Sequence, residues 1–170
     1  MDESLPTLFG SAKTKYDSLE HLDPRSVKAI IQDTLQELQR CLTAVDKLSL
    51  FSPNEELEDI STKNLQYLTI PYLTAELLLK SYDDQRLAAL RRASQALESF
   101  LTRLDQYRIL SKGDQDLFER YRQERGKFSV ISTSSPDEKR KIKISRFQEE
   151  KALKQKLQVS RSSSHNRNMV

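Results

Sequence analysis

The sequence is poor in the residue types on which several classes of protein depend. Its 170 residues include one cysteine, two histidines, three glycines and no tryptophan. A single cysteine cannot form a disulfide within the chain, which fits a reducing cytosolic or nuclear setting. The isolated glycines exclude a glycine-rich phosphate-binding loop, and no Cys-x-x-Cys or His-x-x-x-His pair offers a zinc site.

Long apolar runs are also missing. No stretch of 18 or more apolar residues occurs, so we expect no membrane-spanning segment and no membrane partner. The acidic N-terminus, Met1 to Ser4, lacks the positive and apolar regions of a secretory signal. Few glycines and prolines, together with abundant Leu, Glu, Lys, Gln and Arg, predict an all-α fold.

The charge is distributed unevenly along the chain. From Lys139 onward there are ten Lys or Arg against two acids, a net charge of +8. Residues 1–138 carry 18 Lys or Arg against 23 acids, a net charge of −5. Charges of both signs alternate in the first part, as on a solvated helical surface, so the basic end is the electrostatic feature to explain.

Apolar residues recur at helical spacing over four long segments. They predict helices over about 5–21, 24–50, 61–81 and 83–107, and a short helix around Leu117, Phe118 and Tyr121 that Gly126 stops. The segment 61–81 is apolar on most of its circumference, which indicates a central helix. Pro71 either kinks that helix or marks its true start, and Ser61 or Thr62 is its predicted cap. Helices of this length suggest a bundle or a solenoid of helical hairpins.

Ser135-Pro136-Asp137-Glu138 is a strong helix start, with Ser as cap, Pro in the first position and Glu three residues after the cap. We expect a basic helix over 136–157. Residues 158–170 have almost no apolar content and are predicted to be disordered.

Residues suited to catalysis are scarce, so we expect no enzyme and no cofactor. His21 sits at a predicted helix end, where it meets carbonyls, and His165 lies in the predicted disordered tail. Cys41 falls on an apolar stripe and reads as an inert core thiol. The acidic run 55–59 lacks the spacing of a calcium loop and fits the N-terminal end of the next helix.

Three interpretations of the basic helix remain open at this point. It could be a solvated helix end, a nucleic-acid-binding element or a docking surface for an acidic protein. Nucleic acid is disfavoured because the segment has one aromatic residue, Phe147, and no stacking series. Arg140 and Lys143 share a face, with Ile144 and Phe147 beside them to pin the helix to the rest of the chain. A further possibility is a peptide-binding adaptor with an apolar groove between the third and fourth helices.

Two blocks carry a resemblance to a known family. "VDKLSLFSPNEELEDISTKNLQYLTIPYL", residues 45–73, looks like the signature of the type 2A phosphatase-associated protein family, also called the alpha-4 or immunoglobulin-binding protein 1 family. "RKIKISRFQEEKALKQKL", residues 140–157, resembles that family's basic helix, and "LRRASQALESFLTRLDQYRIL" fits its fourth helix loosely. The resemblance covers most of residues 5–157, and the first block is the more specific.

The resemblance implies an all-helical domain over residues 1–157, similar to tetratricopeptide repeats, with a basic C-terminal helix. Members of the family bind the catalytic subunits of type 2A-like protein phosphatases without catalysing a reaction, in signalling linked to TOR kinase. Their binding determinant, a basic Arg-x-x-Lys pair, matches Arg140 and Lys143, with Lys139 and Arg146 beside them. The resemblance also implies a cytoplasmic, and possibly nuclear, protein without a small-molecule substrate. Because members carry a further flexible C-terminal half, this chain is expected to be a fragment or a truncated form.

Overall fold

The computed structural model describes residues 3–19, 24–52, 54–81, 85–129 and 135–167. Within these ranges every regular element is a helix, so the predicted all-α class is confirmed. The chain divides into two compact units, residues 1–115 and 116–170, which are described separately. The single domain expected over residues 1–157 stays a prediction. No helix in the described ranges has the length and apolar character needed to cross a bilayer.

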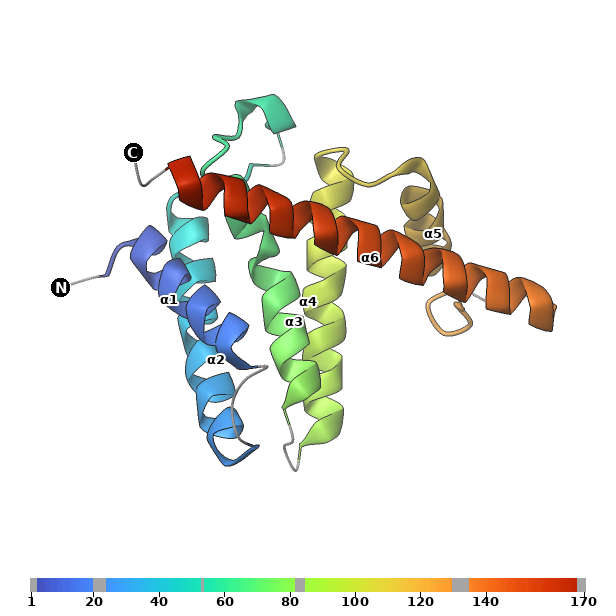
Figure 1. Ribbon diagram of the computed structural model, residues 1–170, viewed down its shortest axis with the longest axis horizontal. Coiled ribbons are helices and arrows are strands. Elements are labelled where there is room, and N and C mark those ends of the chain that lie inside the picture. The colour runs from blue at the N-terminus through green and yellow to red at the C-terminus, as the bar shows by residue number, and fades with distance from the viewer. Residues whose placement is uncertain (1–2, 20–23, 53, 82–84, 130–134, 168–170) are drawn as a thin grey trace. The chain divides into compact units, whose positions relative to one another are not determined.

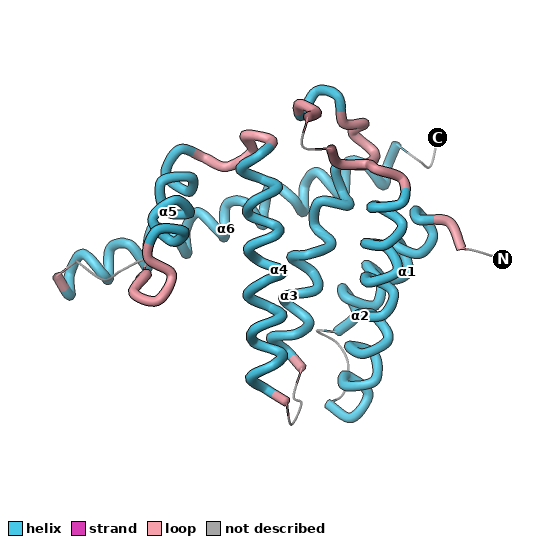
Figure 2. Tube along the Cα trace, turned by 180° about the vertical axis from the view of Figure 1, so that it is seen from behind, coloured by secondary structure: helices cyan, strands magenta, loops and turns pink. Residues whose placement is uncertain are grey.

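Four helices build the first unit. In Figures 1 and 2 they lie side by side and the chain direction alternates from one helix to the next. The closest pairs are the first with the second and the third with the fourth, and the second also packs on the third. Their bounds are α1 Leu5–Ser18, α2 Pro24–Lys47, α3 Ile70–Lys80 and α4 Arg86–Gln106.

The core of this unit forms around α3, as the apolar circumference of that segment predicts. Leu77 and Ala75 are fully buried, and Ile70, Leu73 and Leu78 nearly so. One cluster joins α3 to α1 and α2, and a second joins Ala75 and Leu78 to Ala93 of α4. The expected apolar side of α4 is only partly buried, however, because Leu87 and Leu90 are exposed and small alanines make the contact instead.

Pro71 marks the true start of α3. It occupies the first turn of the α-helix, and the residues before it form a short 3-10 helix, η3 (Leu65–Thr69). A proline in this position loses no hydrogen bond, because the first amides of a helix have no partner within it. The prediction that Ser61 or Thr62 caps the helix is wrong, since η3 begins after Asn64 and has no side-chain cap.

Two helices end on residues in the left-handed conformation. Ser49 follows α2 with φ of 48°, and Arg108 follows α4 with φ of 54°. In each case an amide reaches back five residues: Leu50 to the carbonyl of Val45 at 3.2 Å, and Ile109 to that of Leu104 at 2.8 Å. This closure satisfies helix carbonyls but usually uses glycine. Because residue 49 is not a glycine, the sequence carries no stop signal there. The second helix is therefore predicted to extend to about residue 50, whereas it ends at Lys47.

The turn after α2 is fastened to the end of α4. The carbonyl oxygen of Ser52 accepts hydrogen bonds from Tyr107 Oη at 3.0 Å and Gln106 Nε2 at 3.1 Å. Tyr107 is buried with Ile60 and Leu68, against Phe51. Desolvation raises the pKa of Tyr107, so its hydroxyl stays a hydrogen-bond donor at neutral pH. Much of the block 45–73 therefore has a structural role.

The second unit contains most of α5 (Lys112–Gln123) and all of α6 (Pro136–Arg167). Phe118 of α5 is buried, Tyr121 stacks on it at 6.2 Å, and Phe128 meets Tyr121 edge-on at 5.4 Å. The Arg122 guanidinium lies 4.3 Å from the Phe118 ring centre, a cation–π contact. α5 begins at Lys112, and Gly113 lies in its first turn.

α6 is longer than the sequence predicts. It continues to Arg167, so residues 158–167 are helical rather than disordered. No glycine or proline follows Pro136, and therefore nothing in the sequence stops the helix where apolar content runs out. Residues 168–170 lie outside the described residues.

Candidate partner-binding site

The first turn of α6 is held by a reciprocal capping arrangement. The amide of Glu138 donates to Ser135 Oγ at 3.3 Å, and the amide of Ser135 donates to the Glu138 carboxylate at 3.0 Å. The predicted start is thus confirmed, with Pro136 as the first helical residue. This arrangement satisfies amides that the helix itself cannot pair, and it fixes the position of the basic residues that follow.

The four predicted site residues share one side of α6. At 3.6 residues per turn, Lys139, Arg140, Lys143 and Arg146 fall within about 120° of the helix circumference. Phe147 lies in the same arc, between the positions of Arg140 and Lys143. We call these five residues the basic sector.

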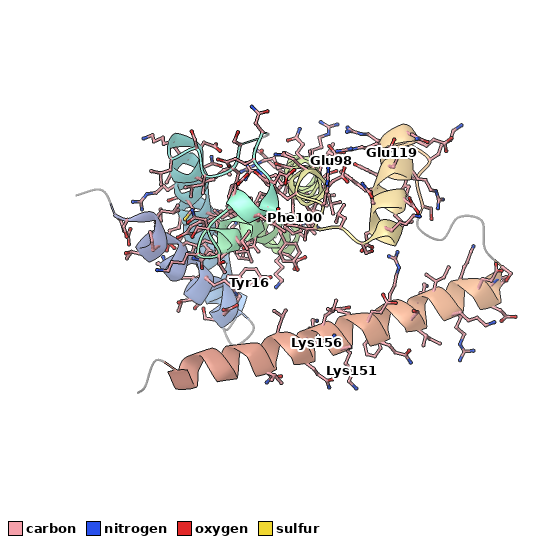
Figure 3. The ribbon with its side chains drawn as sticks, turned by 90° about the horizontal axis from the view of Figure 1, so that it is seen from above. Tyr16, Glu98, Phe100, Glu119, Lys151 and Lys156 are labelled. Carbon is pink, nitrogen blue, oxygen red and sulfur yellow. The ribbon has the colours of Figure 1, made fainter. Side chains whose placement is uncertain are left out.

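The side chains of the basic sector are exposed to solvent. All four cationic side chains are exposed, and Phe147 keeps 66% of its surface. Ile144 keeps 47%, so the two residues expected to pin the helix are exposed rather than buried. Figure 3 shows side chains standing out along α6, with Lys151 and Lys156 labelled.

Among the described residues, no ion pair joins a carboxylate to a cation of the basic sector. Lys154 pairs with Glu150 at 2.7 Å, further toward the C-terminus of α6. Glu138 is engaged in the cap. The sector therefore presents a net positive charge around an exposed aromatic ring, which suits an acidic protein surface with an apolar depression.

The remaining candidates have local structural roles. Cys41 is completely buried, and desolvation raises its pKa to about 11, so the thiol stays protonated at neutral pH. Lys15 was not a candidate. Its hydrogen bond to Asp33, and to a smaller extent that to Glu37, raises the pKa of Lys15. Described residues form no cluster of three or more potential metal ligands. His21 and the side chain of His165 lie outside the described residues.

The acidic run 55–59 binds its own turn rather than the start of α3. Glu55 accepts from the amide of Ser52 at 3.2 Å, and Asp59 accepts from the amide of Glu56 at 3.0 Å. The second bond is part of a capping arrangement for the short 3-10 helix η2 (Leu57–Asp59). The expectation that these acids stabilise a helix N-terminus holds for η2, not for the central helix.

A groove crosses the first unit between α2 and α4, over α3, with a volume of about 1040 Å³. The apolar groove considered between the third and fourth helices stays a prediction. Ala75 and Leu78 of α3 pack against Ala93 of α4 where these two helices meet. In the sequence, the polar residues that line the groove on α2 look like those of any solvated helix face.

Comparison with known proteins bears on both units. A model of the TAP42-like family matches residues 5–169. The PP2A regulatory subunit TAP46 of Nicotiana tabacum is 31% identical over 157 residues, which cover 90% of this chain and 35% of the relative. Immunoglobulin-binding protein 1 family member C of Homo sapiens is 29% identical over 168 residues, 93% of this chain and 49% of the relative.

A relative is also found in a fungus. Type 2A phosphatase-associated protein 42 of Saccharomyces cerevisiae is 27% identical over 169 residues, which cover 86% of this chain and 45% of that protein. The chain thus spans between a third and a half of these relatives. The matched region includes the start of α6 and the basic sector.

Proposed function

Because this chain belongs to the TAP42-like family, we propose that it is a non-catalytic regulatory subunit that binds the catalytic subunit of type 2A-like protein phosphatases. Its relatives are named as PP2A regulatory subunits and as a type 2A phosphatase-associated protein. The proposed partner is a protein with an acidic surface. We propose neither a small-molecule substrate nor a membrane as a partner of this chain.

The observation that carries the assignment of the site is the exposed, one-sided basic sector on a capped helix. Arg140 and Lys143 make the principal contacts, and Lys139 and Arg146 flank them. An exposed ion pair contributes only ~0.2–1 kcal/mol. Loss of one partner of a desolvated interfacial pair costs ~2–5 kcal/mol. The sector therefore binds strongly only if the partner covers Phe147 and removes water from the neighbouring cations.

The broader proposal rests on the same family relationship. The paired antiparallel helices α1–α2 and α3–α4 are compatible with a tetratricopeptide-repeat-like array that acts together with α6 as one binding domain over residues 1–157. TOR-linked signalling and a cytoplasmic, possibly nuclear, location complete the proposal. The single reduced, buried cysteine is consistent with such a compartment.

The test compares two double charge reversals on opposite sides of α6. Arg140→Glu/Lys143→Glu reverses the centre of the basic sector, whereas Lys141→Glu/Lys156→Glu makes the same change in net charge on the roughly opposite side. Binding to the purified PP2A catalytic subunit is measured by surface plasmon resonance. The first variant should lose affinity by about 100-fold or more, and the second by less than about fivefold.

Equal losses in the two variants would show a non-specific charge effect and contradict the assigned site. Full affinity in the Arg140→Glu/Lys143→Glu variant would contradict it as well. Far-UV circular dichroism of both variants checks that α6 keeps its helix. The wild-type association rate should also fall as salt rises, since the cations steer the encounter.

A further inference from the structure

We propose that the groove between α2 and α4 binds an acidic amphipathic helix of a partner protein, at a site separate from the basic sector. Every described residue that lines the groove belongs to the first unit. The proposal does not depend on the proposed function, because the five residues of the basic sector are not part of this lining.

The groove has a length and a volume that suit a bound helix. Its wall on α2 runs from Val27 to Gln39, about 18 Å at the rise of an α-helix. This length matches roughly three turns of a bound helix. The volume of about 1040 Å³ lies at the upper end of the range typical of ligand-binding pockets.

The floor of the groove is apolar. Ile31 and Leu78 are buried at its base, while Val27 and Leu35 remain partly open above them. Ala89 of α4 closes the other side with a small side chain. A bound helix can therefore place apolar residues against α3 without displacing a large side chain of α4.

The described part of the rim is positively charged and rich in amides. Lys28, Lys80 and Arg92 line the groove, one from each of the three helices, and none of the described lining residues is acidic. Further along the same walls stand four glutamines: Gln32, Gln36, Gln39 and Gln85. The three cations favour a bound helix whose apolar face is flanked by carboxylates. The glutamine amides can donate hydrogen bonds to the polar side chains of that helix or accept them.

The same charge argues against two other occupants. The basic segment from Lys139 onward carries a net charge of +8, so a cationic rim would repel α6 of this or another copy. A second copy that docked groove to groove would bring Lys28, Lys80 and Arg92 against like charges. An acidic segment of a different protein has neither penalty.

The test uses two fluorescein-labelled 14-residue helical peptides. Both carry Leu at positions i, i+3, i+4 and i+7, but one has Glu and the other Lys at the flanking positions. Fluorescence anisotropy should show saturable binding of the Glu peptide and at least about tenfold weaker binding of the Lys peptide. No saturable binding of the Glu peptide, or equal binding of both, would overturn the proposal.

Matched variants locate the site. Lys28→Glu/Arg92→Glu should weaken the Glu peptide by about tenfold, while Lys47→Glu/Arg91→Glu, which makes equal charge changes outside the groove on the same helices, should stay within about twofold. Equal weakening would contradict the groove. The Arg140→Glu/Lys143→Glu variant should bind the peptide normally, which separates this site from the basic sector.

Two further measurements keep the result independent of variant folding. Amide chemical shifts of the wild-type protein should move on α2, α3 and α4 when the Glu peptide is added, and shifts confined to α6 would refute the site. Sedimentation of the wild-type protein should show a monomer. A dimer that the Lys28→Glu/Arg92→Glu change dissociates would place a second copy in the groove and overturn the proposal.

Discussion

The four helices of the first unit and the helix α6 are stabilised by different physical effects. In α1 to α3 an apolar stripe is buried, with side chains such as Leu38 and Leu77 almost inaccessible to water, and α4 packs on them through Ala89 and Ala93. In α6 every described side chain except Ile142 is exposed. The first group is stabilised by tertiary packing, whereas α6 depends on its cap and on residues of good helix propensity.

This difference indicates where partner-binding residues can lie. A side chain that is fully buried in the core, such as Leu77, is not accessible to another protein, so α1 to α4 can bind a partner only through the faces that they leave open. α6 buries no such side chain among its described residues, and isolated helices are only marginally stable in water. A bound partner would supply the buried contacts that α6 lacks, so its binding and its stability should be linked.

The largest expected difference is in thiol reactivity. In the native protein Cys41 should react with a thiol reagent at least about 1000-fold more slowly than a cysteine placed in α6 by Ser145→Cys in a Cys41→Ala background. The reason is that Cys41 reacts only after the core opens, whereas position 145 is exposed. Ellman's reagent with and without urea measures both rates, and similar native rates would contradict a buried Cys41.

The pH dependence of the same residue has a definite sign. Burial raises the pKa of Cys41 from 9.0 to about 11, so the folded state holds this proton more tightly than the unfolded state does. The contribution of this group to stability is complete below about pH 9 and is lost as the pH rises toward about 11. Urea unfolding of wild type and Cys41→Ala between these values should show a steeper decline for wild type.

A core substitution should have the next largest effect. Leu77 is fully buried in α3 and Leu79 is 40% exposed on the same helix. Leu77→Ala should lower the free energy of unfolding by ~2–5 kcal/mol, because a cavity remains. Leu79→Ala should cost less than about 1 kcal/mol. Urea denaturation followed by tyrosine fluorescence measures both, and equal losses would show that α3 is not central.

The smallest expected effect is at the α6 cap. Ser135→Ala removes the Oγ that accepts from the amide of Glu138 and should destabilise the first turn by ~1 kcal/mol. Unfolding of the first unit should not change. Amide hydrogen exchange resolves the two regions, with Ser145→Ala as a control that leaves the cap intact. Equally fast exchange at residues 138–141 in wild type and Ser135→Ala would show that the cap has no effect.

The sequence predicts α1 to α4 and the start of α6 well, because each has a local signal. Burial patterns at helical spacing locate the core helices, and Ser135, Pro136 and Glu138 identify the cap. Helix ends were less predictable. Ser49 and Arg108 adopt the left-handed conformation without being glycine, and α6 continues to Arg167 through a segment low in apolar residues.

The basic sector could be predicted in part and the groove hardly at all. The positions of Arg140 and Lys143 on one helix follow from their spacing alone. The exposure of Phe147 depends on what α6 packs against, which spacing does not specify. The groove depends on the distance between α2 and α4 across α3, and on small residues such as Ala89, so no local pattern reveals it.

The most direct test of the central claim is hydrogen exchange of α6 with and without the PP2A catalytic subunit. If the basic sector is the docking surface, amides over residues 139–147 should exchange at least about tenfold more slowly in the complex than in the free chain. Unchanged, rapid exchange over these residues in a complex that has formed would contradict the claim.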